Sequence, residues 1–585
     1  MKWMDKKTLN RIFSPMILSL LFVAAWFALI YVTYGVYYLT NDDIVMMKAF
    51  SGYNTGTPMP YDQFSSFTLG MMYKCLYTLI PAWNWYSYVS ILVVIVSNAV
   101  IIWSIYKQRD LPENSFRYVD FLLIGTLTVA ISLYGIRSIS FTVNAAFSAI
   151  AGVMLLMNLS AEKSIKHLQY ICAVIFMAVA SMIRIDSFMA ILPFAVLVLF
   201  YRAGNRIRTE GRENIRKVCI ELVILLLPLM GVVAYNSVDT VLETKIFPSR
   251  VGADDYDYYR VLYMDHPHIP YEGNEDFYES IGWDREFYDV TGILMYLDPR
   301  FNTENLKKIA EASSSLRGES GALTERVLSS SDKFLDQTRG NKVRICMSIA
   351  VIFFLMTGLV MTVYKLLRKG GGWYDWLFLA GVQAVSMAEW VYIIDRFIDR
   401  SFYCATYPAL FIGVWVFARH AVVLNHRKVL YIPVGLFAVA VMYIAAKQNL
   451  SRWYSGMAKQ RASVMFDADE IFFSHSENLY ICDASVINGT PLFLNMDFRG
   501  CGNMPFWGGT VAYSESFYEM IEKFGYDEFY SNNFFDENVY YITTDSDVRD
   551  SILMQYMKKT YGESVDAKAV DTTDSGVYVY KFCRM

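Results

Sequence analysis

Residues 12–41 read IFSPMILSLLFVAAWFALIYVTYGVYYLTN and contain no Lys, Arg, Asp or Glu. Residues 75–106 form a second run without a charged side chain. A helix needs about 20 consecutive apolar residues to cross roughly 30 Å of hydrocarbon, and both runs are longer than that. The two runs therefore predict helices that span a membrane.

The composition of the whole chain agrees with a membrane protein. Of its 585 residues, 55% are hydrophobic and only 18% are charged, whereas about a quarter of the residues of a soluble protein are charged. The formal net charge of −4 does not suit a protein that binds nucleic acid. The composition thus excludes a soluble enzyme, a fibrous protein and a disordered chain.

Further charge-poor runs extend this pattern along the chain. They lie at about 119–136, 138–159, 168–183, 187–201, 218–237, 343–364, 374–394, 401–418 and 429–446. With the first two runs they predict about eleven transmembrane helices. The predicted fold class is an α-helical polytopic membrane protein.

The loop charges predict the orientation in the cell membrane. With the N-terminus in the cytoplasm, the cytoplasmic segments hold twenty-one Lys and Arg against six Asp and Glu. Because loops rich in Lys and Arg stay in the cytoplasm, this asymmetry favours that orientation. An odd number of spans then places the C-terminal region outside. The first run is too long for a cleaved signal peptide, so we expect a retained signal anchor.

These spans divide the chain into four regions. A transmembrane core of about seven spans covers 1–237 and includes a first outer loop at 36–83, and about four more spans cover 343–446. The two large segments 238–342 and 447–585 are predicted to lie outside the membrane.

The two outer segments differ in pattern. The first is crowded with aromatic residues from Asp254 to Asp289, which predict either a structural cluster or surfaces that stack on sugar rings. The second alternates short strands with amphipathic helices, which is typical of a small α/β domain. The predicted strands are Asn478–Cys482, Pro491–Asn495, Val539–Thr543 and Gly576–Phe582, and the predicted helices are Thr303–Ser313, Ala322–Thr338, Ser514–Phe524 and Val548–Tyr561. Cys482 and Cys501 either form a disulfide or remain thiols.

Charged residues gather at the predicted outer ends of the spans. They are Asp42, Asp43, Arg137, Arg184, Asp186, Glu389, Asp395, Arg396 and Arg400. An ionised side chain near hydrocarbon costs a few kcal/mol, so such residues usually pair or face an aqueous cavity. One outward-opening polar site accounts for them jointly. Taken singly, they also fit a helix cap, a local ion pair in a turn and interfacial anchors.

The segment 44–81, which follows the acidic pair, begins polar and becomes amphipathic. Its apolar residues Phe64, Phe67, Met71, Cys75 and Leu79 recur at helical spacing. This spacing predicts a helix that lies in the outer interface of the membrane. The alternative is an ordinary long loop.

This order of features resembles the GT-C superfamily of membrane glycosyltransferases, which use sugars carried on polyprenyl phosphate. The matching features are a first span with a cytoplasmic N-terminus, the pair Asp42-Asp43 in the first outer loop, an interfacial helix, many further spans and an exported C-terminal domain. A late Arg400 ahead of Tyr407-Pro408 also matches. The likeness covers roughly residues 10–200 and 375–420.

The resemblance implies a mechanism and a set of site residues. Either Asp42 or Asp43 would act as general base, and only one is expected to face the substrate because adjacent side chains diverge. The arginines implied to bind the donor phosphate are Arg184, Arg396 and Arg400, because the guanidinium fork suits phosphate oxygens. The residues implied to support them are Arg137, Asp186, Glu389 and Asp395.

The resemblance also implies the partners. The co-substrate would be a hexose or pentose on a polyprenyl phosphate, held in membrane lipid, and the acceptor a glycan, a lipid or a protein at the cell surface. A divalent metal, Mg²⁺ or Mn²⁺, is a possible cofactor because some members of the family bind one.

Two further classes of membrane protein remain open. A transporter or flippase for polysaccharide or lipid-linked sugar predicts polar residues in mid-membrane and an internal repeat, and the sequence has few of the first and none of the second. An outward-facing polysaccharide polymerase or ligase would favour catalytic His or Arg in the large outer loop, where His266 and His268 lie.

Overall fold

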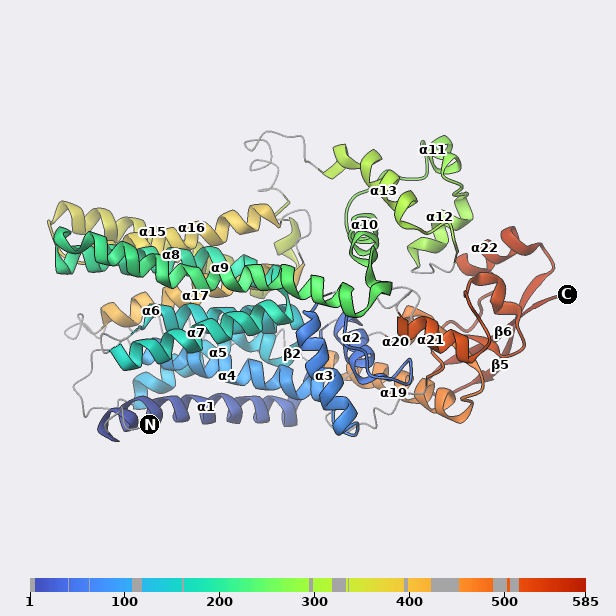
Figure 1. The fold of residues 1–585 in the computed structure, drawn as a ribbon, viewed down its shortest axis with the longest axis horizontal. Coiled ribbons are helices and arrows are strands. Elements are labelled where there is room, and N and C mark those ends of the chain that lie inside the picture. Colours follow the sequence, from blue (N-terminus) through green and yellow to red (C-terminus); the bar gives the residue numbers. More distant parts are fainter. Residues whose placement is uncertain are drawn as a thin grey trace. The chain divides into compact units, whose positions relative to one another are not determined.

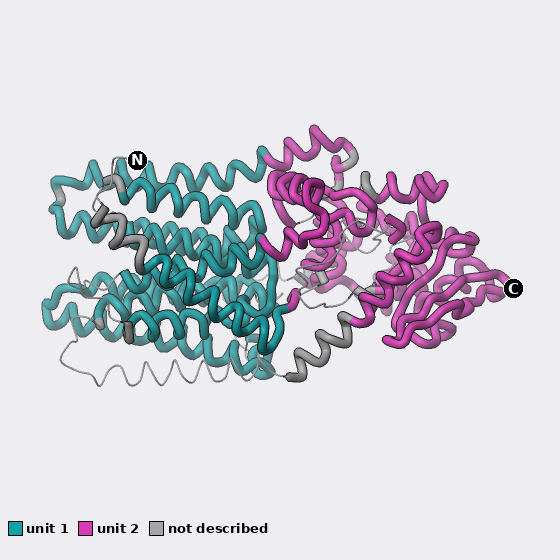
Figure 2. Tube along the Cα trace, turned by 90° about the horizontal axis from the view of Figure 1, so that it is seen from below, with its two compact units in different colours: residues 1–36, 89–238, 324–454 teal, residues 37–88, 239–323, 455–585 magenta. Residues whose placement is uncertain are grey.

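A computed structural model describes most of the chain. The described residues are 6–39, 41–62, 64–107, 118–159, 163–293, 298–317, 333–334, 336–393, 398–421, 452–487, 502–504 and 515–585. Two compact units are coloured separately in Figure 2. The helical unit comprises Met1–Val36, Val89–Val238 and Thr324–Tyr454, and the mixed unit comprises Tyr37–Tyr88, Asp239–Leu323 and Ser455–Met585.

The helical unit consists of long apolar helices (Figure 1). They are α1 (Lys6–Tyr34), α4 (Trp85–Lys107), α5 (Tyr118–Arg137), α6 (Phe141–Met157), α7 (Lys163–Ile183), α8 (Ile185–Glu210), α9 (Ile215–Ile246), α15 (Lys342–Leu367), α16 (Trp373–Tyr392) and α17 (Asp399–Ala421). Eight of the described helices are long and apolar enough to cross a membrane; α6 is apolar but shorter, and α16 is not among the eight. The prediction of a polytopic helical membrane protein is confirmed, whereas the predicted run 429–446 lies outside the described residues.

The predicted run 75–106 is wrong in its first part. Helix α3 (Phe67–Leu79) ends within this run, at Leu79, and α4 begins only at Trp85. The break follows from Pro81, which has no backbone N–H to continue a helix, and from Asn84, whose side chain accepts a hydrogen bond of 3.1 Å from the Ser87 backbone N–H. The charge-free run thus contains the end of one helix and the start of another.

Helix α6 is the buried centre of the helical unit. Every residue from Phe141 to Met157 is buried, and α6 packs against α7, α8 and α17. A Cβ added at Gly152 would lie 2.8 Å from the carbonyl oxygen of Ala173 on α7. Small residues at such contacts let membrane helices approach closely. The packing of α6 against α7, α8 and α17 therefore restricts the positions of the ends of these helices.

The mixed unit contains a four-stranded sheet in the order β3-β4-β6-β5. Strand β3 (Leu479–Cys482) is parallel to β4 (Val539–Thr543), which pairs antiparallel with β6 (Tyr578–Arg584), and β6 pairs antiparallel with β5 (Val565–Thr572). The prediction of Val539–Thr543 is confirmed, and β3 and β6 lie within two residues of their predicted bounds. The predicted strand Pro491–Asn495 and the partner residue Cys501 lie outside the described residues.

Further helices of the mixed unit follow in sequence order. They are α10 (Ala253–Asp265), α11 (Glu275–Ser280), α12 (Arg285–Gly292), α13 (Thr303–Ala312), α19 (Arg452–Ser474), α20 (Ala484–Ile487), α21 (Glu515–Lys523) and α22 (Ile552–Tyr561). The predicted helices at 303–313 and 514–524 are confirmed as α13 and α21 to within one residue at each end, and the predicted helix 548–561 is confirmed as α22 except that it begins four residues later, at Ile552. Most of the predicted helix 322–338 lies outside the described residues.

The aromatic residues of the first outer segment form a structural core. Tyr278, Trp283 and Phe287 have no exposed surface and share one hydrophobic cluster with Leu479 and Met554 from the C-terminal region. Of the two predicted roles, a structural cluster or surfaces that stack on sugar rings, these three rings therefore have the structural one. Both outer segments contribute to this core of the mixed unit.

Candidate functional site

The acidic pair lies in the first turn of α2 (Asn41–Ser51), in the mixed unit. Asp43 is fully buried and its carboxylate accepts a 2.8 Å hydrogen bond from the Tyr86 hydroxyl. Asp42 is partly exposed. Successive side chains of a helix point about 100° apart, and the positive end of the helix dipole favours carboxylates at this position. The two carboxylates therefore have different surroundings, one enclosed and one accessible.

A buried polar cluster supports Asp43. Tyr38 hydrogen-bonds Ser87, and the Asn84 amide donates to the Tyr38 hydroxyl at 3.0 Å. Burial raises the pKa of Tyr38 well above its ordinary value, so its hydroxyl stays neutral. The Tyr86 ring also stacks on Phe50 at 6.3 Å between centroids. These contacts position Tyr86, whose hydroxyl donates the hydrogen bond to Asp43.

The other end of α2 is fixed by a buried ion pair. Lys48 is 2% exposed, and its Nζ lies 3.8 Å from the Asp469 carboxylate of α19 and 4.5 Å from the centre of the Tyr53 ring. Burial raises the pKa of Asp469, and the nearby Lys48 ammonium opposes that shift. Ala49 packs in the same hydrophobic cluster as Ala468 of α19. Helix α2 is thereby attached to the C-terminal region at its far end from the acidic pair.

Helix α3 buries one of the apolar residues that predicted it and exposes others. Phe67 packs against Phe247 and is buried, whereas Met71 and Leu79 are 36% and 77% exposed. Asp239 caps the N-terminus of α3. Its carboxylate accepts a hydrogen bond of 2.6 Å from the Phe67 backbone N–H. An exposed apolar face on a helix with an anchored end is typical of an interfacial membrane helix.

Two of the predicted arginines meet in the helical unit. Arg184, which precedes α8, and Arg400, in the first turn of α17, lie 4.9 and 5.9 Å from the centroid of the Phe141 ring. Arg184 also donates a 2.8 Å hydrogen bond to the Thr142 hydroxyl. These contacts bring the starts of α6, α8 and α17 to one end of the unit. Asp186 is 3.4 Å from Arg184, with a side chain that is 76% exposed.

Other predicted residues lie at the ends of the same helices. Arg137 is fully buried at the end of α5. Both carboxylate oxygens of Glu389, in the last turn of α16, are buried and have no hydrogen-bond partner among the residues that the structure describes. Asp395 and Arg396 lie outside those residues. The acidic pair belongs to the mixed unit, and Arg137, Arg184 and Arg400 belong to the helical unit.

Three supporting residues escaped the sequence analysis. Tyr86 and Phe141 lie inside apolar runs, where an aromatic residue carries no distinguishing signal. Arg344 forms an ion pair with Asp399 and borders a predicted span, so its charge was a usable signal. Asp399 is therefore bound to α15 through Arg344, whereas its neighbour Arg400 lies beside Phe141 of α6.

The metal prediction receives no support from geometry within the described ranges. No group of three or more His, Cys, Asp or Glu side chains there is placed to hold a metal ion. A divalent ion therefore stays a prediction.

Comparisons with known proteins give distant structural similarity. No protein-family model and no curated protein matches the chain. The structure is similar to ArnT from Cupriavidus metallidurans in the apo state, with 9% identity and a TM-score of 0.40 over 96% of this chain and 97% of that one. It is also similar to the same protein bound to undecaprenyl phosphate, with 10% identity and a TM-score of 0.35 over the same shares.

A third similar structure is the oligosaccharyltransferase of Archaeoglobus fulgidus in complex with Zn and sulfate. It has 12% identity and a TM-score of 0.40, and the match covers 97% of this chain and 73% of that one. At these identities and TM-scores the similarity is too distant to assign this chain to a family.

Proposed function

We propose that the protein is a membrane glycosyltransferase that moves a sugar from a polyprenyl-phosphate donor to an acceptor at the outer face of the cell membrane. Asp42 is its general base, and Asp43 positions the turn that carries it. The observation that supports this proposal best is the difference between the two carboxylates. Asp43 is enclosed and bonded by Tyr86, whereas Asp42 stays accessible in the same helical turn.

The chemistry requires one carboxylate that can reach an acceptor hydroxyl. Asp42 takes the proton of that hydroxyl as its oxygen attacks the anomeric carbon of the donor sugar. The bond between the anomeric carbon and the phosphate oxygen breaks, and polyprenyl phosphate leaves with the bonding electrons. A fully enclosed carboxylate such as Asp43 cannot approach the acceptor without rearrangement, so we assign it a positioning role.

Arg184 and Arg400 are the proposed ligands of the departing phosphate. Both guanidinium groups lie within 6 Å of the centre of the Phe141 ring, at 4.9 and 5.9 Å, at the same end of the helical unit. Positive groups directed at the charge that develops on the leaving group stabilise the transition state. Arg396 remains a third proposed ligand from the sequence.

Release of polyprenyl phosphate from lipid-linked sugars tests the proposal in purified protein reconstituted into liposomes. Total lipid-linked sugars extracted from host membranes serve as donor and detergent-extracted host envelope as acceptor. We expect Asp42→Asn to lower the rate about 100-fold or more, as is typical of losing a general base, and Asp43→Asn to lower it less. Asp547→Asn is the matched control, because the Asp547 side chain is exposed and accepts hydrogen bonds only from the neighbouring Arg549 among the contacts described.

Full activity in both Asp42→Asn and Asp43→Asn overturns the assignment. Movement of labelled lipid-linked sugar across the bilayer without release of polyprenyl phosphate favours the transporter alternative instead. The assay therefore separates the two functions in one preparation.

A further inference from the structure

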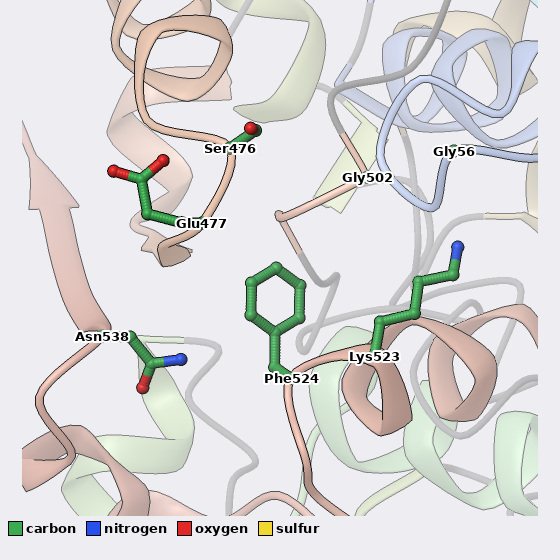
Figure 3. A pocket seen from close by; sticks show the side chains of 7 residues that line it. All are labelled: Gly56, Ser476, Glu477, Gly502, Lys523, Phe524 and Asn538. Carbon is green, nitrogen blue, oxygen red and sulfur yellow. The ribbon is translucent and has the colours of Figure 1, made fainter.

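The mixed unit contains a pocket that the proposed reaction does not use. Its volume is about 550 Å³, within the usual size range of small-molecule sites. Figure 3 shows its lining side chains, with the Phe524 ring directed into the space between Lys523, Asn538 and Glu477. The pocket draws on five separate parts of the chain, namely the loop after α2, the turn after α19, Gly502, the end of α21 and Asn538 before β4.

Two glycines build one wall of this pocket. Gly56 and Gly502 have φ angles of +83° and +67°, which side-chain-bearing residues rarely adopt. A Cβ at Gly56 would lie 3.6 Å from the Gly502 Cα and 3.7 Å from the Lys523 Nζ. The two backbone segments therefore lie close together, and a side chain at either position would narrow the pocket.

The lining chemistry suits a neutral polar ligand. The Asn538 side chain lines the pocket, and its amide offers both donors and an acceptor to a ligand. Its oxygen lies 3.3 Å from the Tyr526 hydroxyl, which also donates to the Asp536 carboxylate at 3.0 Å. Glu477 and Lys523 also line the pocket, so its lining carries one acidic and one basic side chain and has no excess of positive charge that would select a strongly anionic group. A saccharide presents hydroxyl donors and acceptors at its edge and an apolar face that can lie on the Phe524 ring.

The position of the pocket separates it from the acidic pair. Gly56 follows the C-terminal end of α2, whereas Asp42 lies at its N-terminal end. From Asp42 to Ser51, the last residue of α2, the helix rises over nine residue steps, or about 14 Å at 1.5 Å per residue. A ligand in this pocket is therefore too far from Asp42 to be the reacting sugar.

We propose that this pocket binds a saccharide portion of the acceptor, away from the hydroxyl that reacts. The inference rests on the proposed function, because it assigns the pocket to the acceptor of that reaction. Bound here, a glycan chain would be held to the same unit as Asp42 while its reacting end remains free.

Binding is tested with the full chain in lipid nanodiscs and two fluorescein-labelled neutral trisaccharides, maltotriose and chitotriose. We expect at least one to bind, and Phe524→Ala to weaken that binding at least tenfold, while Phe524→Tyr retains it because the ring face is kept. Tyr518→Ala is the matched control, since Tyr518 is an exposed ring on helix α21, which ends one residue before Phe524, and does not line the pocket. Glu477→Gln and Asn538→Ala test the polar contacts separately.

The outcomes separate this inference from the proposed function. Asp42→Asn should abolish sugar transfer and leave trisaccharide binding unchanged, whereas Phe524→Ala should raise the acceptor KM about tenfold with little change in kcat. If neither trisaccharide binds the wild type, or if Phe524→Ala and Tyr518→Ala bind equally well, the saccharide pocket is overturned while the role of Asp42 stands on its own assay.

Discussion

Asp298 is a single residue whose ionisation stabilises the mixed unit. Burial opposes its charge, but hydrogen bonds from Arg300 and Tyr556 outweigh burial and hold the pKa of Asp298 below its usual value of 3.8. The folded state thus binds this proton less tightly than the unfolded chain. The stabilisation is fully present above a pH of about 4 and is lost as the pH falls through the lower pKa of the folded state.

Asp298→Asn should therefore destabilise the protein in a pH-dependent way. At pH 7 we expect the free energy of unfolding to fall by about 1.5–3 kcal/mol, because bonds to a charged group are lost. At pH 3 the loss should be smaller. Hydrogen–deuterium exchange of α12 and α22 in detergent measures it, with Asp547→Asn as an exposed control. An equal effect at both pH values would contradict the assigned charge.

The acidic pair shows what single residues reveal in the sequence. The sequence predicted that only one of Asp42 and Asp43 faces the substrate, because neighbouring side chains diverge. It did not indicate which one, since that depends on the Tyr86 hydroxyl, 43 residues further along the chain. A contact between distant positions leaves no local pattern, so the sequence could propose the pair but not distinguish its members.

At the scale of elements, the attachment of α2 to α19 is testable. Removing one partner of a buried ion pair leaves an uncompensated charge and costs about 3–5 kcal/mol, whereas replacing both with apolar residues is often nearly neutral. We expect Lys48→Met to lower thermal stability strongly, and Lys48→Met combined with Asp469→Leu to recover most of it. Thermal unfolding of the four proteins of this double-mutant cycle in detergent measures the coupling. Additive effects would contradict a direct Lys48–Asp469 interaction.

The sequence predicted helices and strands correctly where most of their side chains are buried, and it failed where an element has both buried and exposed side chains. Strand β4, with four of five residues buried, was predicted with correct bounds. Strand β5 was missed because most of its side chains are exposed and its sequence VDAKAVDT reads as polar. On α3 the apolar spacing predicted a helix, but it could not show that Tyr73 and Tyr77 would be the buried rings and Met71 and Leu79 the exposed ones.

At the scale of the whole molecule, the chain passes repeatedly between its two units. Hydropathy divided the sequence into consecutive regions, whereas each unit is assembled from three separate stretches. The predicted outer loop 36–83 illustrates the reason. Its residues Met59 and Tyr61 pack in one hydrophobic cluster with Ile542 and Val579 of the sheet. Such packing joins segments far apart in the sequence, which a reading of successive runs cannot detect.

The orientation of the whole chain in the membrane is the last prediction. Twenty-one basic residues against six acidic ones mark the segments expected in the cytoplasm, among them the exposed C-terminal part of α8, whereas the mixed unit is expected outside. In a variant with all eight cysteines replaced, Glu563→Cys should react with a membrane-impermeant maleimide in intact cells. Thr209→Cys should react only after the cells are permeabilised.

Both test positions are exposed in the structure, so a difference in labelling reports their side of the membrane and not their burial. Labelling of both cysteines after permeabilisation is the control that each thiol can react. The reversed pattern would place the acidic pair and the mixed unit in the cytoplasm. In that case nucleotide-linked sugars would be accessible to Asp42, and the physical reason for a lipid-linked donor would be lost.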